Sequence, residues 1–315
     1  MGLSFRAGSA SVRTPATSAN LGPGFDALGL ALALYDDVTA RVVPTGCRVG
    51  VTGEGAGELP TDETHLVVRA MRAAFDVLGG QPAGLAVDCV NRIPQARGLG
   101  SSSAAIVAGV QLARALVVDG RERMDDEAAL RLAAELEGHP DNVAPCLLGG
   151  FTIAWTEDPA GARAVSLGPA AAVRPTVYVP GLRGLTSVAR AALPATVPHS
   201  DAARNAARAA LLVHALTADP TMLYAATEDY LHQRYRSSGM PDSARLLGEL
   251  RALGVPAVIS GAGPSILALT SPPDGFDPGM DWVAHRLPID VTGARLDVGT
   301  LGHAERDPVA AGRKS

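Results

Sequence analysis

Lysine is nearly absent from this chain of 315 residues. Of its 27 basic side chains only one is a lysine, Lys314, next to the C-terminal residue. A Walker-A phosphate loop needs a lysine, and a protein kinase needs one on a strand beside the nucleotide. Pyridoxal enzymes and Schiff-base aldolases also depend on a lysine amine. All four classes are therefore excluded, unless a residue at the very end of the chain does the work.

Cysteines are few and scattered. They are Cys47, Cys89 and Cys146, and no two form a CxxC pair. An odd number at these spacings favours neither a disulfide framework nor a thiolate zinc site. Thiols of this kind suit a reducing compartment, so we expect a cytoplasmic protein. There is no HExxH motif, and His139 with Asp141 is a possible metal pair that lacks a third ligand nearby.

Excess positive charge and long apolar runs are also missing. The net charge is −5, whereas binding to nucleic acid needs a basic face. No apolar stretch approaches the ~18 residues of a membrane span, and the first 17 residues lack the apolar core of a signal peptide. We expect neither nucleic acid nor membrane as a partner. With 47% hydrophobic and 19% charged residues, the chain is not of the disordered class.

Strands and helices alternate irregularly, which favours an α+β architecture over a doubly wound sheet. Apolar spacing predicts helices over 64–78, 101–118, 125–136, 186–193, 201–217, 221–234 and 242–253. Alternation predicts strands over 30–34, 38–42, 85–89, 151–155, 173–179 and 257–260. We place a boundary near residue 170. It separates an N-terminal domain, 1–170, from a C-terminal domain, 171–300, and we expect 301–315 to be a flexible tail.

A glycine and serine segment before a long predicted helix is the strongest motif. It contains Pro94, Arg97, Gly98, Leu99, Gly100, Ser101, Ser102 and Ser103. Glycines let the backbone approach a ligand closely, and a helix N-terminus offers unpaired N–H groups and partial positive charge to phosphate. Serine hydroxyls add donors or a magnesium ligand. The alternative is a serine-capped helix after a glycine turn, and the segment by itself leaves both readings open.

Two further loops carry polar residues within glycine-rich frames. Segment 15–31 holds an amide and a carboxylate, Asn20 and Asp26. Segment 260–266 follows an apolar strand and contains Gly261 and Gly263. Ordinary tight turns, with Asx hydrogen bonds in the first loop, are the alternative for both.

These three segments, together with 137–145 and 148–151, resemble the motifs of the GHMP kinases in order and over nearly the whole chain. The similarity is greatest to the branch that acts on homoserine. The resemblance implies an N-terminal domain like the second domain of ribosomal protein S5 and a ferredoxin-like C-terminal domain. It also implies ATP over residues 98–102, Mg²⁺, and an amino-acid substrate between the domains. The implied reaction transfers the γ-phosphoryl group to the hydroxyl of L-homoserine, a step toward threonine.

The resemblance assigns roles on the nucleotide side. Ser102 matches a serine near magnesium and the β- and γ-phosphates, and Ser101 is its neighbour. Glu135 matches a magnesium-binding glutamate, with Glu137 as a competing ligand. A surface pair of Glu135 with Arg131 is the alternative that needs no ligand. The residues expected to act in catalysis are Ser102, Glu135, Asn20 and Arg190.

On the substrate side the resemblance points to acceptors for an ammonium group and donors for a carboxylate. The matching residues are Asn20, Asp26, His139, Asp141, Thr186, Arg190, Arg236, Gly261 and Gly263. Thr186 and Arg190 lie one helical turn apart and can face the same ligand. Arg234 replaces a proline of the family segment that ends at Arg236. For Arg190 and Arg236, the alternative is an ordinary arginine that lies on the solvent-exposed face of a helix.

Two positions depart from the family. Asn142 stands where galactokinases and mevalonate kinases carry an aspartate base, which implies direct attack by the substrate hydroxyl, driven by positioning and charge stabilisation. His65 replaces an asparagine that lies near the adenine. Two other functions stay open: a GHMP kinase for another small hydroxylated substrate, and a non-catalytic sensor of ATP and ligand. The oligomeric state also stays open, with a homodimer as one option.

Overall fold

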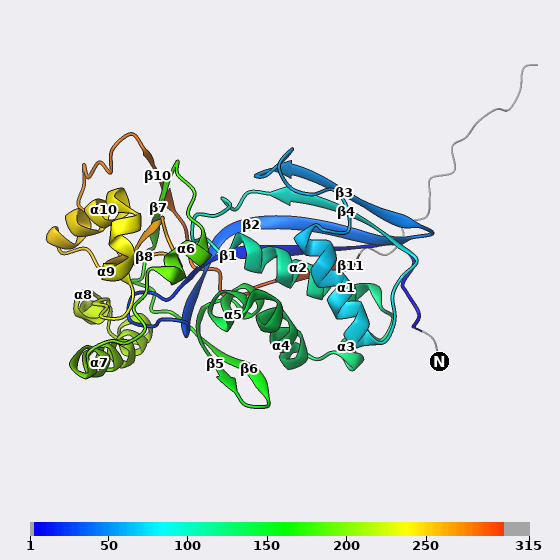
Figure 1. Cartoon of the computed structure of the whole chain (residues 1–315), viewed down its shortest axis with the longest axis horizontal. Coiled ribbons are helices and arrows are strands. Elements are labelled where there is room, and N and C mark those ends of the chain that lie inside the picture. The colour runs from blue at the N-terminus through cyan, green and yellow to red at the C-terminus, as the bar shows by residue number, and fades with distance from the viewer. Residues whose placement is uncertain (1–2, 299–315) are drawn as a thin grey trace, which may run out of the picture.

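A seven-stranded sheet organises the first part of the computed structural model, which describes residues 3–298 (Figure 1). Five strands follow the order β11 (Arg295–Val298), β1 (Ser9–Ala19), β2 (Leu28–Val43), β4 (Gly84–Asn91) and β3 (Gly46–Gly53). Strand β5 (Phe151–Glu157) pairs with β2 and with β6 (Gly161–Leu167). Only β3 and β4 pair in parallel among these described strands, and helix α1 (Leu66–Leu78) provides the crossover that a parallel pair requires.

Helices gather on one face of this sheet and form the main core with it (Figure 1). They are α1, α2 (Ser101–Leu116), α4 (Asp126–Glu137) and α5 (Pro140–Leu148), with the short α3 (Gly120–Arg123) before α4. Val67, Met71 and Phe75 lie on the buried face of α1. Gly109 lets α2 approach this helix closely, because a Cβ there would lie 2.5 Å from the Val67 carbonyl oxygen. The packed helices hold the start of α2 fixed at the sheet.

A second, smaller sheet carries the rest of the described chain. All its neighbouring strands are antiparallel, in the order β10 (Trp282–Arg286), β7 (Thr176–Pro180), β9 (Ile266–Ala268) and β8 (Ala257–Ile259). Between β7 and β8 come α6 (Thr186–Ala191), α7 (His199–Thr217), α8 (Leu223–Ala226), α9 (Gln233–Arg236) and α10 (Pro241–Ala252). Single 3-10 turns lie at Pro220–Met222 and Ser237–Gly239. The expected two-domain α+β architecture is confirmed.

Most predicted elements match the structure, but the strands expected over 30–34 and 38–42 form one strand, β2, and β1, β3, β6, β9 and β10 were not among those predicted. Three further differences concern residues 221–234, 140–148 and 295–298. The helix expected over 221–234 is broken, because the Asp229 carboxylate accepts backbone N–H groups of residues 231–233 and so starts the separate helix α9. Helix α5 was not predicted, although Pro140 stands at its first turn, where proline is favoured. Strand β11 pairs with β1, so residues 295–298 join the N-terminal sheet rather than the part expected over 171–300. The tail expected over 301–315 lies outside the described residues.

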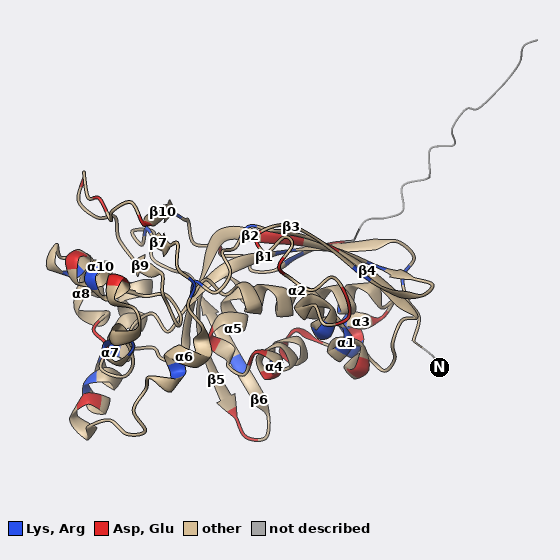
Figure 2. Cartoon of the chain, turned by 45° about the horizontal axis from the view of Figure 1, so that its top comes forward, with Lys and Arg blue, Asp and Glu red and all other residues tan. Residues whose placement is uncertain are grey.

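Charged residues of both signs are interspersed on the helices in the view of Figure 2. Within residues 3–298, no helix has the length and apolar character needed to cross a membrane. The cysteines Cys47, Cys89 and Cys146 are all free thiols.

Candidate active site

A cavity of about 450 Å³ opens where the two sheets meet. Both halves of the chain contribute to it, because the start of α2 and the 15–31 loop face the 184–190 segment and the 260–263 loop. Of the residues predicted for the site, it is lined by Asn20, Asp26, Arg97, Gly98, Leu99, Gly100, Ser101, Ser102, His139, Asp141, Thr186, Arg190, Arg236 and Gly261. Residues more than two hundred positions apart in the sequence therefore form one site.

The glycine and serine segment forms an open helix N-terminus at this cavity. Helix α2 begins at Ser101 after Gly100, which has φ 70° and provides no side-chain cap. The first N–H groups of the helix are therefore available to an anion. Both glycines are required by space, since a Cβ on Gly100 would lie 1.9 Å from Thr17 Oγ1 and one on Gly98 would lie 2.2 Å from the Ser260 carbonyl oxygen.

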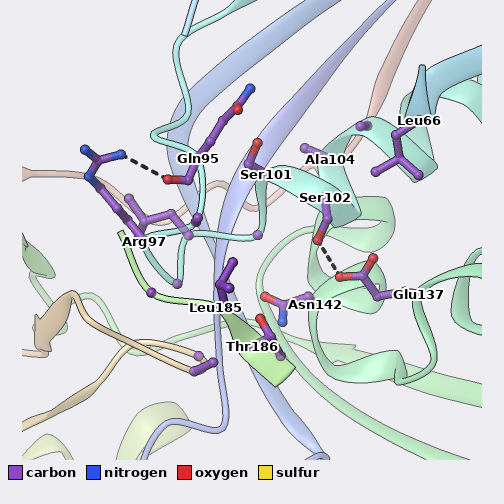
Figure 3. Close-up of a pocket in the computed structure, with 18 of the residues that line it drawn as sticks. Leu66, Gln95, Arg97, Ser101, Ser102, Ala104, Glu137, Asn142, Leu185 and Thr186 are labelled. Carbon is purple, nitrogen blue, oxygen red and sulfur yellow. Dashed lines mark hydrogen bonds between the residues drawn. The ribbon is translucent and has the colours of Figure 1, made fainter. Parts of the chain in front are cut away.

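Glu137, rather than Glu135, meets the serines. The hydroxyls of Ser102 and Ser103 each donate to Glu137 Oε1 at 2.7 Å. Figure 3 shows Glu137 and Ser102 facing each other at the cavity. Glu135, predicted as the metal ligand, is exposed and does not line the cavity, whereas Glu137, the competing candidate, does. Arg131 pairs with Glu127 at 3.5 Å instead of with Glu135.

Hydrogen bonds and an ion pair connect Asn20 and Asp26, in the loop after β1, to the second domain. Both have positive φ, 66° and 55°, which is uncommon outside glycine. Asn20 Oδ1 accepts from the Asp26 N–H at 2.9 Å, and its Nδ2 donates to the Gly261 carbonyl at 2.8 Å. Arg190 makes a bidentate pair with the Asp26 carboxylate, with N···O distances of 2.7 and 3.0 Å. Two predicted substrate residues of opposite charge thus meet from different domains.

The start of α5 brings three polar residues to the cavity. His139 Nδ1 lies 2.6 Å from Asp141 Oδ1, and the Asp141 side chain is almost completely buried. Burial lowers the pKa of His139, but the hydrogen bond and negative charge of Asp141, aided by Glu137, outweigh it and raise this pKa overall. Asn142 Oδ1 accepts from Thr17 Oγ1 at 2.7 Å, so the amide is fixed beside the glycine loop.

Arg236 is the arginine of the 231–236 segment that reaches the cavity. Its side chain is 2% exposed, and Nη1 donates to the Gly261 carbonyl at 3.2 Å. Burial lowers the pKa of Arg236, and the nearby Arg190 adds to this effect. Arg234 points elsewhere: it is half exposed and pairs with Asp201 at 2.7 Å.

Several predicted residues support the site without lining it. Pro94, Ser103 and Gly263 do not line the cavity, and Ser103 is fully buried beneath Glu137.

Arg97 does line the cavity, but its guanidinium donates to the carbonyls of Gln95, Pro180 and Gly181 at 2.9–3.0 Å. This side chain therefore ties the glycine loop to the end of β7 and has little left to offer a phosphate.

The apolar end of the cavity was not predicted from the sequence. Val38, Leu59, Pro60 and Leu66 line it, and no sequence pattern separates them from ordinary core residues. His65, noted for replacing an asparagine, also lines this end. Its Nδ1 accepts from the Val67 N–H at 3.3 Å, and burial lowers its pKa, so the ring caps α1 in its neutral form.

Comparison with known proteins places this site within a family. The model for the GHMP kinases N terminal domain matches residues 65–150, which include the glycine and serine loop. Homoserine kinase from Streptomyces coelicolor is 58% identical over 300 residues, covering 94% of this chain and 96% of that protein. Homoserine kinase from Clavibacter michiganensis is 50% identical and covers 93% of this chain and 95% of that protein.

A solved structure agrees with these sequence relatives. The crystal structure of homoserine kinase from Cytophaga hutchinsonii matches with a TM-score of 0.80 at 30% identity, covering 94% of this chain and all of that one. The match therefore includes both sheets and the cavity between them. With more than half of its residues shared with a relative of nearly equal length, the chain belongs to the GHMP kinases and, within them, to the homoserine kinases.

Proposed function

We propose that this chain transfers the γ-phosphoryl group of ATP to the side-chain hydroxyl of L-homoserine, forming O-phospho-L-homoserine in a step toward threonine. The observation that carries the proposal is the 58% identity to a homoserine kinase over 94% of the chain. The cavity supports it, because its lining combines apolar side chains, an open helix N-terminus and a pair of opposite charges. Free cysteines are consistent with our expectation of a cytoplasmic enzyme.

The nucleotide would lie along the start of α2. N–H groups of the first helical turn and the hydroxyls of Ser101 and Ser102 face the cavity, where they can bind the phosphates. The adenine would then extend toward Leu59 and Leu66 at the apolar end. This arrangement needs no lysine, which agrees with the single Lys314 of the sequence.

A magnesium ion fits the donors at the phosphate position. Within the described residues no group of three His, Cys, Asp or Glu side chains could hold a metal by itself. Magnesium in phosphotransferases is usually held by one or two carboxylates together with substrate phosphates. Glu137 and the Ser102 hydroxyl are the two donors in place for it. When bound, the ion neutralises charge that develops on the phosphates.

The amino-acid end of the cavity suits a zwitterion. The carboxylates of Asp26 and Asp141 and the amide oxygen of Asn20 can accept from an ammonium group, and the guanidinium groups of Arg190 and Arg236 can bind a carboxylate. Thr186 lies one turn before Arg190 on α6 and adds a hydroxyl to the same wall. Asp26 and Arg190, which pair with each other in the structure, would then pair with the ammonium and carboxylate groups of the substrate. Neither charge would be left without a partner.

Proton transfer requires no aspartate base in this proposal. Asn142, which is neutral, holds the position next to the serine loop and is fixed by Thr17. The substrate hydroxyl would attack the γ-phosphorus in line with the bond to the departing ADP, and its proton would pass to an oxygen of the transferred phosphoryl group. The rate enhancement would come from orientation and from charge stabilisation at the α2 N-terminus. His139 would help to hold the substrate.

A coupled assay of ADP release tests the function directly. We expect turnover with homoserine to exceed that with serine, threonine, mevalonate and galactose. Equal or greater turnover with another member of this panel would assign a different acceptor to the same fold. ATP binding without turnover on any of them would indicate a sensor.

Substitution of Arg236 or Arg234 tests the substrate end of the cavity separately. Arg236→Leu should raise the homoserine KM at least tenfold, because a charge-assisted hydrogen bond is worth roughly 1.5–3 kcal/mol, and should leave the ATP KM nearly unchanged. Arg234→Leu is the matched control, since Arg234 is half exposed and outside the cavity. A greater loss of homoserine affinity in Arg234→Leu than in Arg236→Leu would contradict this assignment.

A further inference from the structure

His232 contacts Arg236 and is completely buried. Its Nδ1 is 3.0 Å from Arg236 Nη1, and its Nε2 is 2.9 Å from the Gly22 carbonyl oxygen. The ring packs against Phe25, with 5.2 Å between the ring centroids. His232 does not line the cavity itself, so it has no direct access to a substrate there.

The two contacts determine the protonation state of this imidazole. A guanidinium can only donate, so Nδ1 must accept and carries no proton. A backbone carbonyl can only accept, so Nε2 must carry the proton that it donates to Gly22. His232 is therefore neutral, as the Nε2–H tautomer. Burial also lowers the pKa of His232 and so favours this form at neutral pH.

The neighbouring carboxylate does not change this picture. Asp229 Oδ2 lies 3.7 Å from His232 Nε2, beyond hydrogen-bond distance. Its oxygens accept the backbone N–H groups of residues 231–233 at 2.6–3.3 Å. The charge of Asp229 is thus stabilised by the start of α9.

The contact with His232 is one of three that hold the guanidinium group of Arg236 in its orientation. Nε donates to the Ala189 carbonyl at 3.3 Å, and Nη1 donates to both His232 Nδ1 and the Gly261 carbonyl. Among the contacts within residues 3–298, Nη2 has no hydrogen-bond partner. A guanidinium held at Nε and Nη1 by three acceptors keeps the two N–H groups of Nη2 for a ligand.

The same imidazole also reaches the other domain. Gly22 lies in the loop that carries Asn20 and Asp26, and a Cβ on Gly22 would lie 2.9 Å from the Thr227 carbonyl oxygen. This loop and the α8–α9 segment are therefore in close contact at His232. One neutral ring links the carboxylate-binding arginine to the loop that would bind the ammonium group.

We propose that His232 is a positioning residue for substrate recognition: its unprotonated Nδ1 orients Arg236 toward the substrate carboxylate, while the hydrogen bond from its Nε2–H to Gly22 keeps the ring in the tautomer that leaves Nδ1 free to accept. This rests on the proposed function, because Arg236 is taken to bind the α-carboxylate of homoserine. Arg236 touches the substrate and His232 acts through it.

Two amide substitutions separate the two ends of the ring. In His232→Asn, the amide oxygen can accept at the position of Nδ1, but the side chain cannot reach Gly22. In His232→Gln, the amide nitrogen can donate at the position of Nε2, but Arg236 loses its acceptor. We expect His232→Gln to raise the homoserine KM about tenfold, the loss of one hydrogen bond to a charged group. His232→Asn should stay within about threefold of wild type. The ATP KM and kcat at saturating homoserine should change little in both variants.

A double-mutant comparison and a spectroscopic measurement complete the test. In the Arg236→Leu background, His232→Gln should cause no further increase in the homoserine KM, because the two residues act as one unit. The ¹⁵N shifts of the His232 ring in the wild-type protein should report the neutral Nε2–H tautomer at neutral pH, a measurement that does not depend on any variant folding.

The outcomes distinguish this proposal from the one on which it rests. A wild-type protein without homoserine-dependent ADP release would remove both. An active wild type with an unchanged KM in His232→Gln, or with equal losses in the Asn and Gln variants, would overturn the positioning role alone. So would a ring protonated at Nδ1, or additive losses in the double mutant.

Discussion

Exchange of the Glu137 carboxylate for an amide is the sharpest probe of the phosphate site. In Glu137→Gln the side chain keeps its length and an oxygen for the serine hydroxyls, but it loses its charge. Glu137 Oε1 accepts two hydrogen bonds of 2.7 Å, from Ser102 and Ser103. A hydrogen bond to a charged group is worth roughly 1 kcal/mol more than one to a neutral group. Removing the charge of Glu137 should therefore weaken its two contacts with the serine hydroxyls by about 2 kcal/mol in total. Loss of a magnesium ligand adds to this figure.

We therefore expect Glu137→Gln to lower kcat by about 30- to 1,000-fold, which corresponds to ~2–4 kcal/mol of activation free energy. The measurement is kcat from coupled ADP release at saturating ATP and homoserine, repeated over a range of Mg²⁺ concentrations. Higher Mg²⁺ should recover part of the lost rate. Glu135→Gln is the matched control, and as a change at an exposed residue it should alter kcat no more than about twofold.

The reasoning is refuted if the effects are reversed. A large loss in Glu135→Gln, with Glu137→Gln close to wild type, would mean that the end of α4 turns its other face to the phosphates. A loss in Glu137→Gln that extra Mg²⁺ does not relieve, together with a lower unfolding temperature, would assign Glu137 to holding the serine loop rather than to the metal.

Two further predictions concern the glycine loop and the histidine at the start of α5. Gly100→Ala should destabilise the protein by about 2 kcal/mol or more in denaturant unfolding, from its positive φ and from a Cβ 1.9 Å from a threonine hydroxyl. Gly138→Ala, with φ 90° and no atom within 4 Å of the added Cβ, should show only the cost of the backbone conformation, and an equal loss in both would contradict the steric argument. The raised pKa of His139 means that its protonated form stabilises the fold fully below about pH 6.5, and that this stability is lost as the pH rises through the folded-state pKa. His139→Gln should remove that step from the unfolding temperature measured against pH, and it should weaken homoserine binding more than it slows saturated turnover; an unchanged pH profile would show that Asp141 does not favour the charged ring.

Local signals in the sequence carried much of the architecture. Apolar spacing located α1 and α4, since one face of each helix is buried, and it also located α2, which is buried on nearly all sides. The prediction of one continuous helix over 221–234 was wrong. Helix propensity is an average preference of each residue type, whereas here the Asp229 carboxylate accepts backbone N–H groups of the following residues. The pairing of β11 with β1 joins residues almost three hundred positions apart, and no local pattern encodes such a contact.

The sequence by itself determined the family and located the glycine and serine loop at the start of a helix. Glycines at 98 and 100, followed by serines at a helix start, have a meaning that depends only on backbone geometry and neighbouring positions. The near-absence of lysine likewise argued against whole classes of enzyme without any knowledge of the fold.

Only the tertiary structure decided which of several similar side chains enters the cavity. Glu135 and Glu137 are two positions apart on one helix, which places them roughly 200° apart around its axis. Sequence spacing fixes that angle but not which side faces α2, because the packing of α4 against its neighbours sets the rotation of the whole helix. The same holds for Arg234 and Arg236 on α9, where the acceptors that hold Arg236 come from Ala189, His232 and Gly261. Side chains of equal chemistry differ here only in the direction they point, and that direction is a property of the packed molecule.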